Sequence, residues 1–456
     1  MAKIKSKYVC QQCGYESAGY LGKCPECASW SSFVEEVTST NTLAKKNTLI
    51  LDDNPPMKVN DIITNTETRF ATAISEFDRV LGGGIVQGSV ILLAGDPGIG
   101  KSTLLLQTSG TLTSAGKTVL YTSAEESLTQ IKLRAERLKV TSDNLYIYSQ
   151  TNLEAIKKQI EELKPDLVII DSIQAIYSQD IQSTAGSVSQ IRECCNSLIN
   201  IAKRNNIAVI VIGHVTKEGN IAGPKVLEHM VDAVIQFEGD KYKSHRILRS
   251  MKNRFGNTSE VGIFEMEETG LREILNPSEL FIKDLECTQA PGSVTIVTNE
   301  GSRPLLVEIQ ALVGTTPYPT PRRVANGVDT GRVHQILAVL EKRVGLNLSK
   351  QDVYVNVIGG LDITETAADL GIALAITTCA RDIVMDKYTA IVGEIGLSGE
   401  IRAVSNIDKR IIEAQKLGFK KILIPQMNTL NKDIEGIKII KVKNILEAFN
   451  LGLTKE

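Results

Sequence analysis

From about residue 70, short apolar runs alternate with amphipathic stretches along the chain. Five runs have the length and apolar content of strands that are buried on both faces: residues 90–94, 118–122, 145–148, 167–170 and 208–213. Two of the stretches between them, 128–138 and 152–163, carry apolar side chains at helical spacing. Because strands that alternate with helices build a parallel sheet flanked by helices, the pattern predicts an α/β domain.

The pattern changes on both sides of this region. Residues 237–268 have the character of hairpins, and a second block of strand and helix signals begins near residue 291, with helices predicted at 332–343 and 367–379. Before residue 70, polar residues and the pair Pro55-Pro56 indicate a linker. The predicted organisation is a small module over 1–34, a linker over 35–66, an α/β domain over 67–272 and a second α/β domain over 273–456.

Composition limits the classes of partner. The chain has 456 residues, enough for two or three domains with full cores, and its formal net charge is −2. No global positive field attracts nucleic acid, so any such contact must come from local basic stretches. No apolar run approaches 18 residues, and no apolar signal region follows the N-terminus. We therefore expect a cytoplasmic protein that does not enter a membrane.

The octapeptide GDPGIGKS at residues 95–102 follows a predicted strand and precedes a predicted helix. This context is typical of a nucleotide-binding P-loop, whereas an isolated glycine-rich turn has no such neighbours. Lys101 is expected to reach the β- and γ-phosphates of ATP, and the Ser102 hydroxyl to hold Mg²⁺. The residues predicted to contact the nucleotide are Gly95, Asp96, Pro97, Gly98, Ile99, Gly100, Lys101, Ser102 and Thr103.

Three further positions follow predicted strands and suit nucleotide hydrolysis. Asp171 ends a buried apolar run and is the candidate second Mg²⁺ ligand, although strands also end in plain acidic turns. Glu125 is the candidate base for the attacking water, Glu126 is the alternative, and a solvated helix start explains both equally simply. His214 follows 208–213 and could sense the γ-phosphate or be a structural histidine.

Four of the eight cysteines form the pattern C-x₂-C-x₁₀-C-x₂-C near the N-terminus: Cys10, Cys13, Cys24 and Cys27. This spacing predicts a four-thiolate zinc site. Disulfides are the alternative, but they suit a secreted module and the chain shows no signal peptide. Too few apolar residues lie between the knuckles to build a core, so the metal should hold the segment folded. Cys194, Cys195, Cys287 and Cys379 lie in apolar surroundings and are expected to be packed thiols.

A basic run extends from Lys241 to Arg254, with six Lys or Arg and no acid. Such a run is usually a solvated strand face. Its end, KNRFG at 252–256, differs because Lys252 and Arg254 lie two apart and would point the same way on a strand. The pair could clamp DNA or the γ-phosphate held by an adjacent subunit.

Taken together and in this order, the zinc knuckles, the P-loop, Glu125-Glu126, Asp171 and the KNRFG pentapeptide resemble the bacterial RadA (Sms) family of DNA-repair ATPases. The resemblance covers essentially the whole chain. It implies a RecA-like ATPase core, a hexameric ring, and Lys252 and Arg254 acting on a neighbour's nucleotide. It also implies that residues 174–188 and 216–224 face a central channel that holds DNA.

The C-terminal block resembles the proteolytic domain of Lon through 359–362, 364–375 and 393–401. Where that family has its nucleophilic Ser, this chain has the tetrapeptide TAAD at 366–369, and an alanine methyl cannot attack a carbonyl. Asp408 aligns with the catalytic Lys, and Lys409 is one residue away. We expect a non-proteolytic scaffold whose segment 319–323, with two arginines, could face DNA or be a plain exposed loop.

The resemblance implies a DNA-dependent ATPase of recombinational DNA repair. It would bind single-stranded and branched DNA and promote branch migration or strand extension together with the recombinase RecA, using ATP, Mg²⁺ and Zn²⁺. Two other classes are an ATP-dependent protease, which the missing Ser disfavours, and a nucleotide-gated switch that recruits a recombinase without moving DNA.

Overall fold

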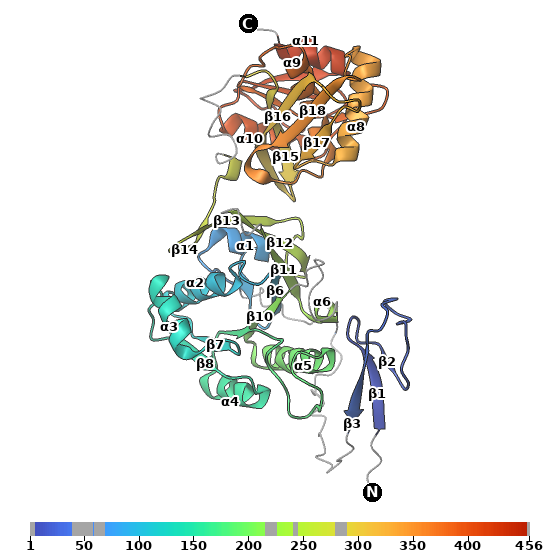
Figure 1. The fold of residues 1–456 in the computed structure, drawn as a ribbon. Helices are drawn as coiled ribbons and strands as arrows, with labels where there is room; N and C mark the ends of the chain where they lie inside the picture. Colours follow the sequence, from blue (N-terminus) through green and yellow to red (C-terminus); the bar gives the residue numbers. More distant parts are fainter. Residues whose placement is uncertain are drawn as a thin grey trace. The chain divides into compact units, whose positions relative to one another are not determined.

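The protein was analysed as a computed structural model, which divides into two units, Met1–Leu275 and Asn276–Glu456 (Figure 1). It describes residues 5–38, 58, 69–214, 226–239, 245–278 and 290–453.

The N-terminal module is a three-stranded antiparallel sheet with the order β2-β1-β3. Its strands are β1 (Lys5–Cys10), β2 (Glu16–Ser17) and β3 (Phe33–Thr38). β3 pairs with β1 along its whole length, so the module reaches Thr38 and includes the first residues of the predicted linker. The rest of that linker, apart from residue 58, lies outside the described residues.

The centre of the first unit is a nine-stranded sheet with the order β14-β13-β12-β11-β6-β10-β9-β7-β8. The strands from β11 to β8 in this order run parallel, and β12, β13 and β14 continue antiparallel as the predicted hairpins. The strands are β6 (Val90–Gly95), β7 (Val119–Ser123), β8 (Leu145–Ser149), β9 (Leu167–Asp171), β10 (Ala208–His214), β11 (Ala233–Glu238), β12 (His245–Asn253), β13 (Val261–Glu267) and β14 (Gly270–Glu273).

Alternate side chains of β6 enter two different cores. Ile91 and Leu93 pack in one cluster, which includes Leu105 of α2 (Lys101–Ser114). Val90 and Leu92 pack in the other. Because a strand presents successive residues to opposite faces, this sheet is covered on both sides. The helices that supply the covers are α2 and α3 (Leu128–Arg137) on one face, and α4 (Leu153–Leu163) and α5 (Val188–Asn205) on the other.

Shorter elements border this sheet in the first unit. They are β4 (Arg69–Phe70), β5 (Ile85–Val86), α1 (Ser75–Leu81) and α6 (Val226–Met230). The five strands and two helices predicted for this domain are confirmed, with ends within two residues of the predicted ones.

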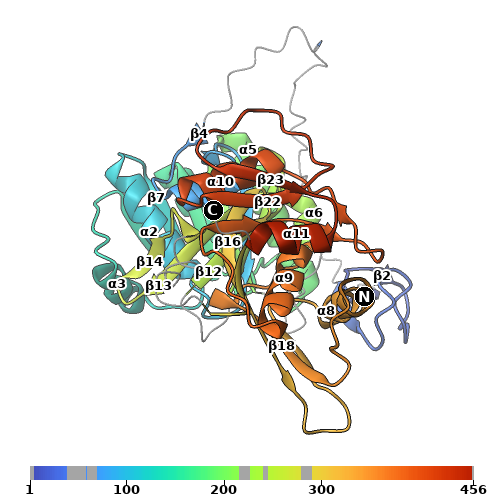
Figure 2. The ribbon, with the colours of Figure 1, turned by 90° about the horizontal axis from the view of Figure 1, so that it is seen from above.

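The second unit contains a seven-stranded mixed sheet with the order β17-β18-β16-β15-β19-β22-β23. The segment that joins β16 to β17 projects from the body of this unit (Figure 2). The strands are β15 (Ser293–Glu300), β16 (Arg303–Thr315), β17 (Arg323–Asn326), β18 (Gln351–Val357), β19 (Thr389–Ile391), β22 (Lys421–Pro425) and β23 (Lys438–Val442). A separate two-stranded ribbon pairs β20 (Glu394–Ile395) with β21 (Ile401–Arg402), which come between β19 and β22 along the chain.

The helices of the second unit are α8 (Thr330–Val339), α9 (Asp369–Ala380), α10 (Ile407–Lys416) and α11 (Ile445–Leu453). The helix predicted at 332–343 is α-helical only to Val339 and then widens into a π-helical turn over Leu340–Val344. The helix predicted at 367–379 begins two residues later, at Asp369, because a 3₁₀ turn over Thr366–Ala368 precedes it.

An ion pair between a fully buried arginine and a partly exposed glutamate connects three elements of the second unit. Arg410 on α10 has an exposed fraction of 0%, and its guanidinium donates to both carboxylate oxygens of Glu365 at 2.8 and 2.7 Å. It also donates to the carbonyls of Val297 at 2.6 Å and Ser405 at 3.0 Å. The single side chain therefore connects α10, β15 and the turn that leads into α9.

Replacing Arg410 with methionine should lower the free energy of unfolding of this unit by about 1–3 kcal/mol, because Glu365 and two carbonyls lose their donor. Arg402→Met is the matched control. It removes an ion pair with Glu400 between exposed side chains, which is worth about 0–1 kcal/mol. Thermal and urea unfolding measure both variants. Equal free energies of unfolding in the two variants would show that the Arg410–Glu365 pair stabilises the unit no more than the exposed Arg402–Glu400 pair does.

Candidate nucleotide and metal sites

The P-loop lies where the pattern predicts it, between the carboxyl end of β6 and the first turn of α2. Its glycines have backbone angles that side chains disfavour, with φ of 78° at Gly98 and 119° at Gly100. A Cβ on Gly100 would also lie 2.7 Å from Cε of Met266. The loop thus needs glycine at Gly100 for its backbone conformation, whereas the flexible end of Met266 could move aside, and the loop ends at a helix N-terminus suited to phosphate.

Lys101 is buried, with 4% of its surface exposed. Its Nζ donates to the carbonyls of Gly95 at 2.7 Å and Asp96 at 2.8 Å. Burial lowers the pKa of Lys101 to about 8, although the charges of Asp171, Asp96 and Glu125 oppose the shift. The ammonium therefore lies inside the loop, among carboxylates that favour its charged form.

Asp171 and Glu125 come together at the carboxyl edge of the sheet. Asp171 ends β9, which pairs with β7 so that Asp171 is opposite Ser123. Burial raises the pKa of Asp171, and hydrogen bonds from Tyr121 and Ser102 partly reverse that shift. Ser102 and Asp171, the two predicted Mg²⁺ ligands, are thus in direct contact. Oxygen donors of this kind are the ligands that Mg²⁺ prefers, so these residues fit the ion.

The two candidate bases have different surroundings. Glu125 is exposed and its Oε1 accepts a hydrogen bond from the Ser172 hydroxyl, next to Asp171. Glu126 is half-buried and forms an ion pair with Arg134 of α3. Because the Glu126 carboxylate is engaged by Arg134 while Glu125 lies beside Asp171, the geometry favours Glu125. His214 is opposite Gly95 in the β10–β6 register, at the same edge, but its side chain lies outside what the structure describes.

The KNRFG pentapeptide lies near the amino end of β6, whereas the P-loop follows the carboxyl end of that strand. Lys252 Nζ donates to the carbonyls of Glu228 at 2.7 Å and Val231 at 2.8 Å, beside α6. Arg254 follows the end of β12, and its Nη1 lies 3.0 Å from Oδ1 of Asp232. The other oxygen of Asp232 accepts from the backbone N–H of Val90, the first residue of β6. The P-loop begins at the opposite end of that strand.

Arg246 is a residue that the sequence interpretation missed. The basic run was expected to be a solvated strand face, yet Arg246 is 6% exposed and its Nε donates to the P-loop carbonyl of Ile99 at 3.3 Å. Arg246 lies two residues before buried Leu248, so strand alternation could have identified it as inward-facing. Residues 240–244 lie outside the described part of the chain.

The predicted DNA-facing segments are only partly described. Residues 215–225 lie outside the described part of the chain. Residues 174–188 are described, and Gln190 of α5 holds them. The Gln190 side chain is 1% exposed and donates to three carbonyls of that loop, those of Ser178, Ile181 and Ser183.

The segment 319–323 of the second unit presents its two arginines differently. Arg322 stacks on the ring of Tyr318 at 4.1 Å, and half of that tyrosine is exposed. Arg323 donates to the backbone carbonyls of Leu348 and Gln351, so its guanidinium is engaged within its own unit. Only the first of these guanidiniums lies beside an exposed aromatic ring.

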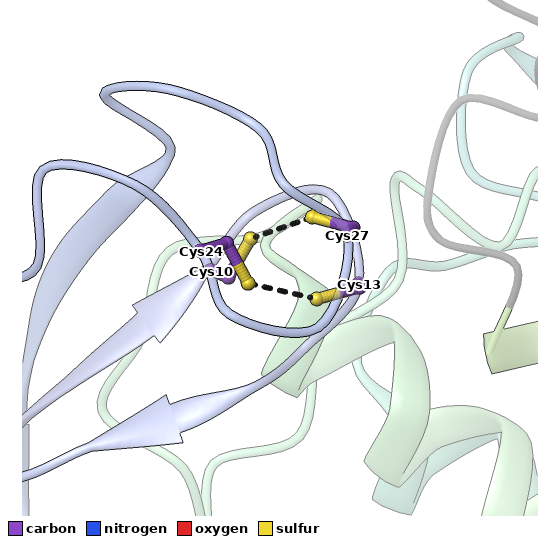
Figure 3. Close-up of side chains that lie close together, drawn as sticks. All are labelled: Cys10, Cys13, Cys24 and Cys27. Atoms are coloured by element: carbon purple, nitrogen blue, oxygen red, sulfur yellow. Dashed lines mark hydrogen bonds between the residues drawn. The ribbon is translucent and has the colours of Figure 1, made fainter.

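The four N-terminal cysteines converge (Figure 3). Their sulfurs all lie within 4.8 Å of one another, with 3.7 Å between Cys10 and Cys27 and 3.5 Å between Cys13 and Cys24. A zinc ion with four sulfurs at 2.3 Å has sulfur–sulfur edges of about 3.8 Å, whereas a disulfide is about 2.05 Å long. The site therefore fits a tetrahedral metal, and the cysteines are free thiols.

Each knuckle of this site is closed by the same backbone turn. The N–H of Gly14 donates to the backbone carbonyl of Cys10, and the N–H of Ala28 donates to the backbone carbonyl of Cys24, both at 2.9 Å. Burial opposes ionisation of Cys10, yet hydrogen bonds from Ser32 and from backbone N–H groups bring its pKa down to about 6. Burial raises the pKa of Cys13, and the neighbouring thiols raise it further. The cluster thus stabilises thiolate on Cys10, as a metal ligand requires.

The other cysteines behave as packed side chains where they are described. Cys194 and Cys195 are fully buried and burial raises the pKa of each to about 12, while Cys379 is half-buried. Cys287 lies outside the described residues.

Most residues at the Lon-like positions of the second unit are buried or form contacts with other side chains of that unit. The Thr366 hydroxyl donates to Glu394 at 2.7 Å, and Ala367 and Ala368 are buried. Asp369 is 1% exposed and forms an ion pair with Arg332. Asp408 accepts from the side chain of Asn431 at 2.7 Å, and Lys409 is exposed.

A four-cysteine ribbon, a P-loop domain with a parallel-rich sheet and a second α/β domain together define a P-loop ATPase with an N-terminal metal ribbon. Residues 8–35 match the rubredoxin metal binding domain, 55–220 match an AAA domain, and 328–428 match subunit ChlI of Mg-chelatase. The predicted fold class is confirmed.

Curated relatives identify the family. The chain is 50% identical to the DNA repair protein RadA of Halalkalibacterium halodurans over 98% of this chain and 99% of that protein. It is 50% identical to RadA of Listeria monocytogenes and 49% identical to RadA of Bacillus subtilis, each over 99% of this chain and 100% of the relative. The chain belongs to the RadA family of DNA repair proteins, as the motifs indicated. No helix among the described residues could cross a bilayer.

Proposed function

We propose that this protein is a cytoplasmic DNA-dependent ATPase of recombinational repair that works as a hexameric ring. It binds single-stranded and branched DNA and, with the recombinase RecA, promotes branch migration or strand extension. The family and its AAA domain support the coarse part of this proposal. The position of the KNRFG pentapeptide supports the requirement for a neighbouring subunit.

That position carries the argument for a ring. Arg254 is bound through Asp232 to Val90, whereas the P-loop begins at Gly95 at the far end of the same strand. Five strand steps of about 3.3 Å separate these ends by roughly 16 Å. Arg254 is therefore remote from the phosphates that its own chain would bind. Since 53% of its side chain is exposed, it is accessible to the nucleotide of an adjacent protomer.

Within one protomer, the proposed roles follow the contacts. The P-loop amides and Lys101 bind the phosphates of ATP, and Ser102 and Asp171 hold Mg²⁺, which neutralises charge on the transferred phosphoryl group. Glu125 orients and deprotonates water beside them. His214, which is opposite Gly95 in the strand register, is proposed to pass the state of the nucleotide to the segment that follows it and so to DNA.

The second unit is proposed to be a non-proteolytic scaffold. Its Thr366 hydroxyl is bound to a carboxylate, and Asp408 occupies the place of the expected lysine. A carboxylate held by an amide cannot supply the neutral amine that activates a Ser nucleophile in Lon-type proteolysis.

Mixing two inactive variants tests action between protomers. Arg254→Ala should keep nucleotide binding but lose DNA-stimulated hydrolysis and branch migration, and Lys101→Ala should lose hydrolysis. In a mixed ring, an Arg254→Ala protomer offers an intact P-loop to the intact Arg254 of a Lys101→Ala neighbour. At equal amounts, about one quarter of head-to-tail interfaces are complete, so the mixture should regain measurable turnover.

Arg249→Ala is the matched control for the Arg254 variant. It removes a guanidinium of β12 that pairs with Glu238 of β11 at 2.7 Å, outside the pentapeptide, and it should hydrolyse ATP like the parent. A mixture that stays as inactive as its separate components, although both variants assemble, would reject the proposed action across the interface.

A further inference from the structure

Tyr121 contacts the predicted metal-binding carboxylate from the neighbouring strand. Its Oη lies 2.6 Å from Oδ2 of Asp171, and 1% of the tyrosine surface is exposed. β7 and β9 run parallel, so the side chain of Tyr121 reaches the end of β9 from within the core. The phenol O–H is the donor and the carboxylate oxygen the acceptor.

This donor restricts the carboxylate. Asp171 is 7% exposed, so few water molecules can solvate its charge. A hydrogen bond to Oδ2 fixes the rotation of the carboxylate, and with it the direction in which Oδ1 is presented. A partner that fixes a ligating carboxylate in this way commonly changes metal affinity or activity by about 10–100-fold.

We propose that Tyr121 is a positioning residue, which aligns the Asp171 carboxylate for Mg²⁺ by holding one of its oxygens. The inference rests on the proposed role of Asp171 as a metal ligand. It adds a residue that touches neither the nucleotide nor the metal and that acts only through the aspartate.

The test is a titration of free Mg²⁺ at fixed ATP. Tyr121→Phe removes only the hydroxyl and keeps the ring in the core. Its half-saturating Mg²⁺ concentration should rise about 10–100-fold, and turnover should recover as Mg²⁺ is raised. Mn²⁺ binds such sites more tightly than Mg²⁺ and should reduce the defect. Tyr146→Phe on the adjacent strand β8, where the tyrosine is 46% exposed, is the control and should titrate like the parent.

A double-mutant cycle separates positioning from a structural role. Mg²⁺-dependent binding of a fluorescent ATP analogue is measured in Asp171→Asn with and without Tyr121→Phe. If the tyrosine acts through Asp171, its removal has no further effect on Mg²⁺ dependence in that background. A purely structural tyrosine would lower the melting temperature in both backgrounds and leave the Mg²⁺ midpoint of the single variant unchanged.

The outcomes distinguish two failures. If Asp171→Asn shows the Mg²⁺ dependence of the parent, the proposed function loses its metal ligand. If Asp171→Asn shifts that dependence while Tyr121→Phe stays within twofold of the parent, only the role of Tyr121 is rejected. Should Tyr121→Phe fail to fold, Tyr121→Met fills the same space without a hydroxyl and carries the same titration.

Discussion

Replacing Lys101 with alanine should lower ATP turnover at least about 100-fold while leaving the fold intact. Lys101 is the only basic residue in the P-loop sequence. Its ammonium stabilises the negative charge that develops on the γ-phosphoryl group. Nucleotide binding should weaken less, because the backbone N–H groups of the loop remain. Burial lowers the pKa of Lys101 to about 8, so at neutral pH the charge destabilises the folded protein and its removal should not weaken the fold.

Stability and turnover must be measured on the same preparation. The free energy of unfolding should change by less than about 1 kcal/mol, which corresponds to about 2–4 °C in a unit of this size. Lys132→Ala, which removes an exposed lysine paired with Glu136 on α3, controls for the loss of a positive charge. Parent-like turnover by Lys101→Ala would refute the P-loop assignment. If the variant instead shows no cooperative melting transition, its loss of activity results from unfolding and not from the missing ammonium.

Five strands of the first unit could be predicted because each is an apolar run bounded by polar residues. Residues 167–170 illustrate this, since Leu167–Asp171 is buried throughout and has no alternation that could be misread. Helix ends were harder to predict. The pattern at 332–343 continues smoothly through Val339, and nothing in the sequence indicates that the backbone widens into a π-turn there.

Local motifs gave the site residues, but contacts between distant elements did not follow from them. Tyr121 and Asp171 are 50 positions apart, and only the β7–β9 register brings the phenol to the carboxylate. The same holds for Arg254, whose spacing from Lys252 suggested a shared direction on one strand. In the structure β12 ends at Asn253, so the two side chains contact different groups, carbonyls near α6 and the carboxylate of Asp232.

Removing one thiolate should unfold the N-terminal ribbon without unfolding the ATPase domain. The buried core of the ribbon consists of Cys10, Cys24 and Phe33, and two of these three are themselves predicted ligands. So small an apolar core cannot offset the conformational entropy of more than thirty ordered residues. Structural zinc contributes about 10–16 kcal/mol of apparent binding free energy in comparable modules, so Cys24→Ala should lose both metal and fold there.

Metal content and protease protection measure the two losses together. The parent should carry one zinc ion per chain and resist cleavage within residues 5–38, and Cys24→Ala should fail on both counts while its ATPase domain melts as in the parent. Cys379→Ala, a half-buried thiol in the second unit, removes a sulfur that accepts a hydrogen bond from Val313 and should leave zinc unchanged. Full zinc in Cys24→Ala would contradict the prediction, because it would mean that three thiolates with a water as fourth ligand are enough or that the metal is held elsewhere.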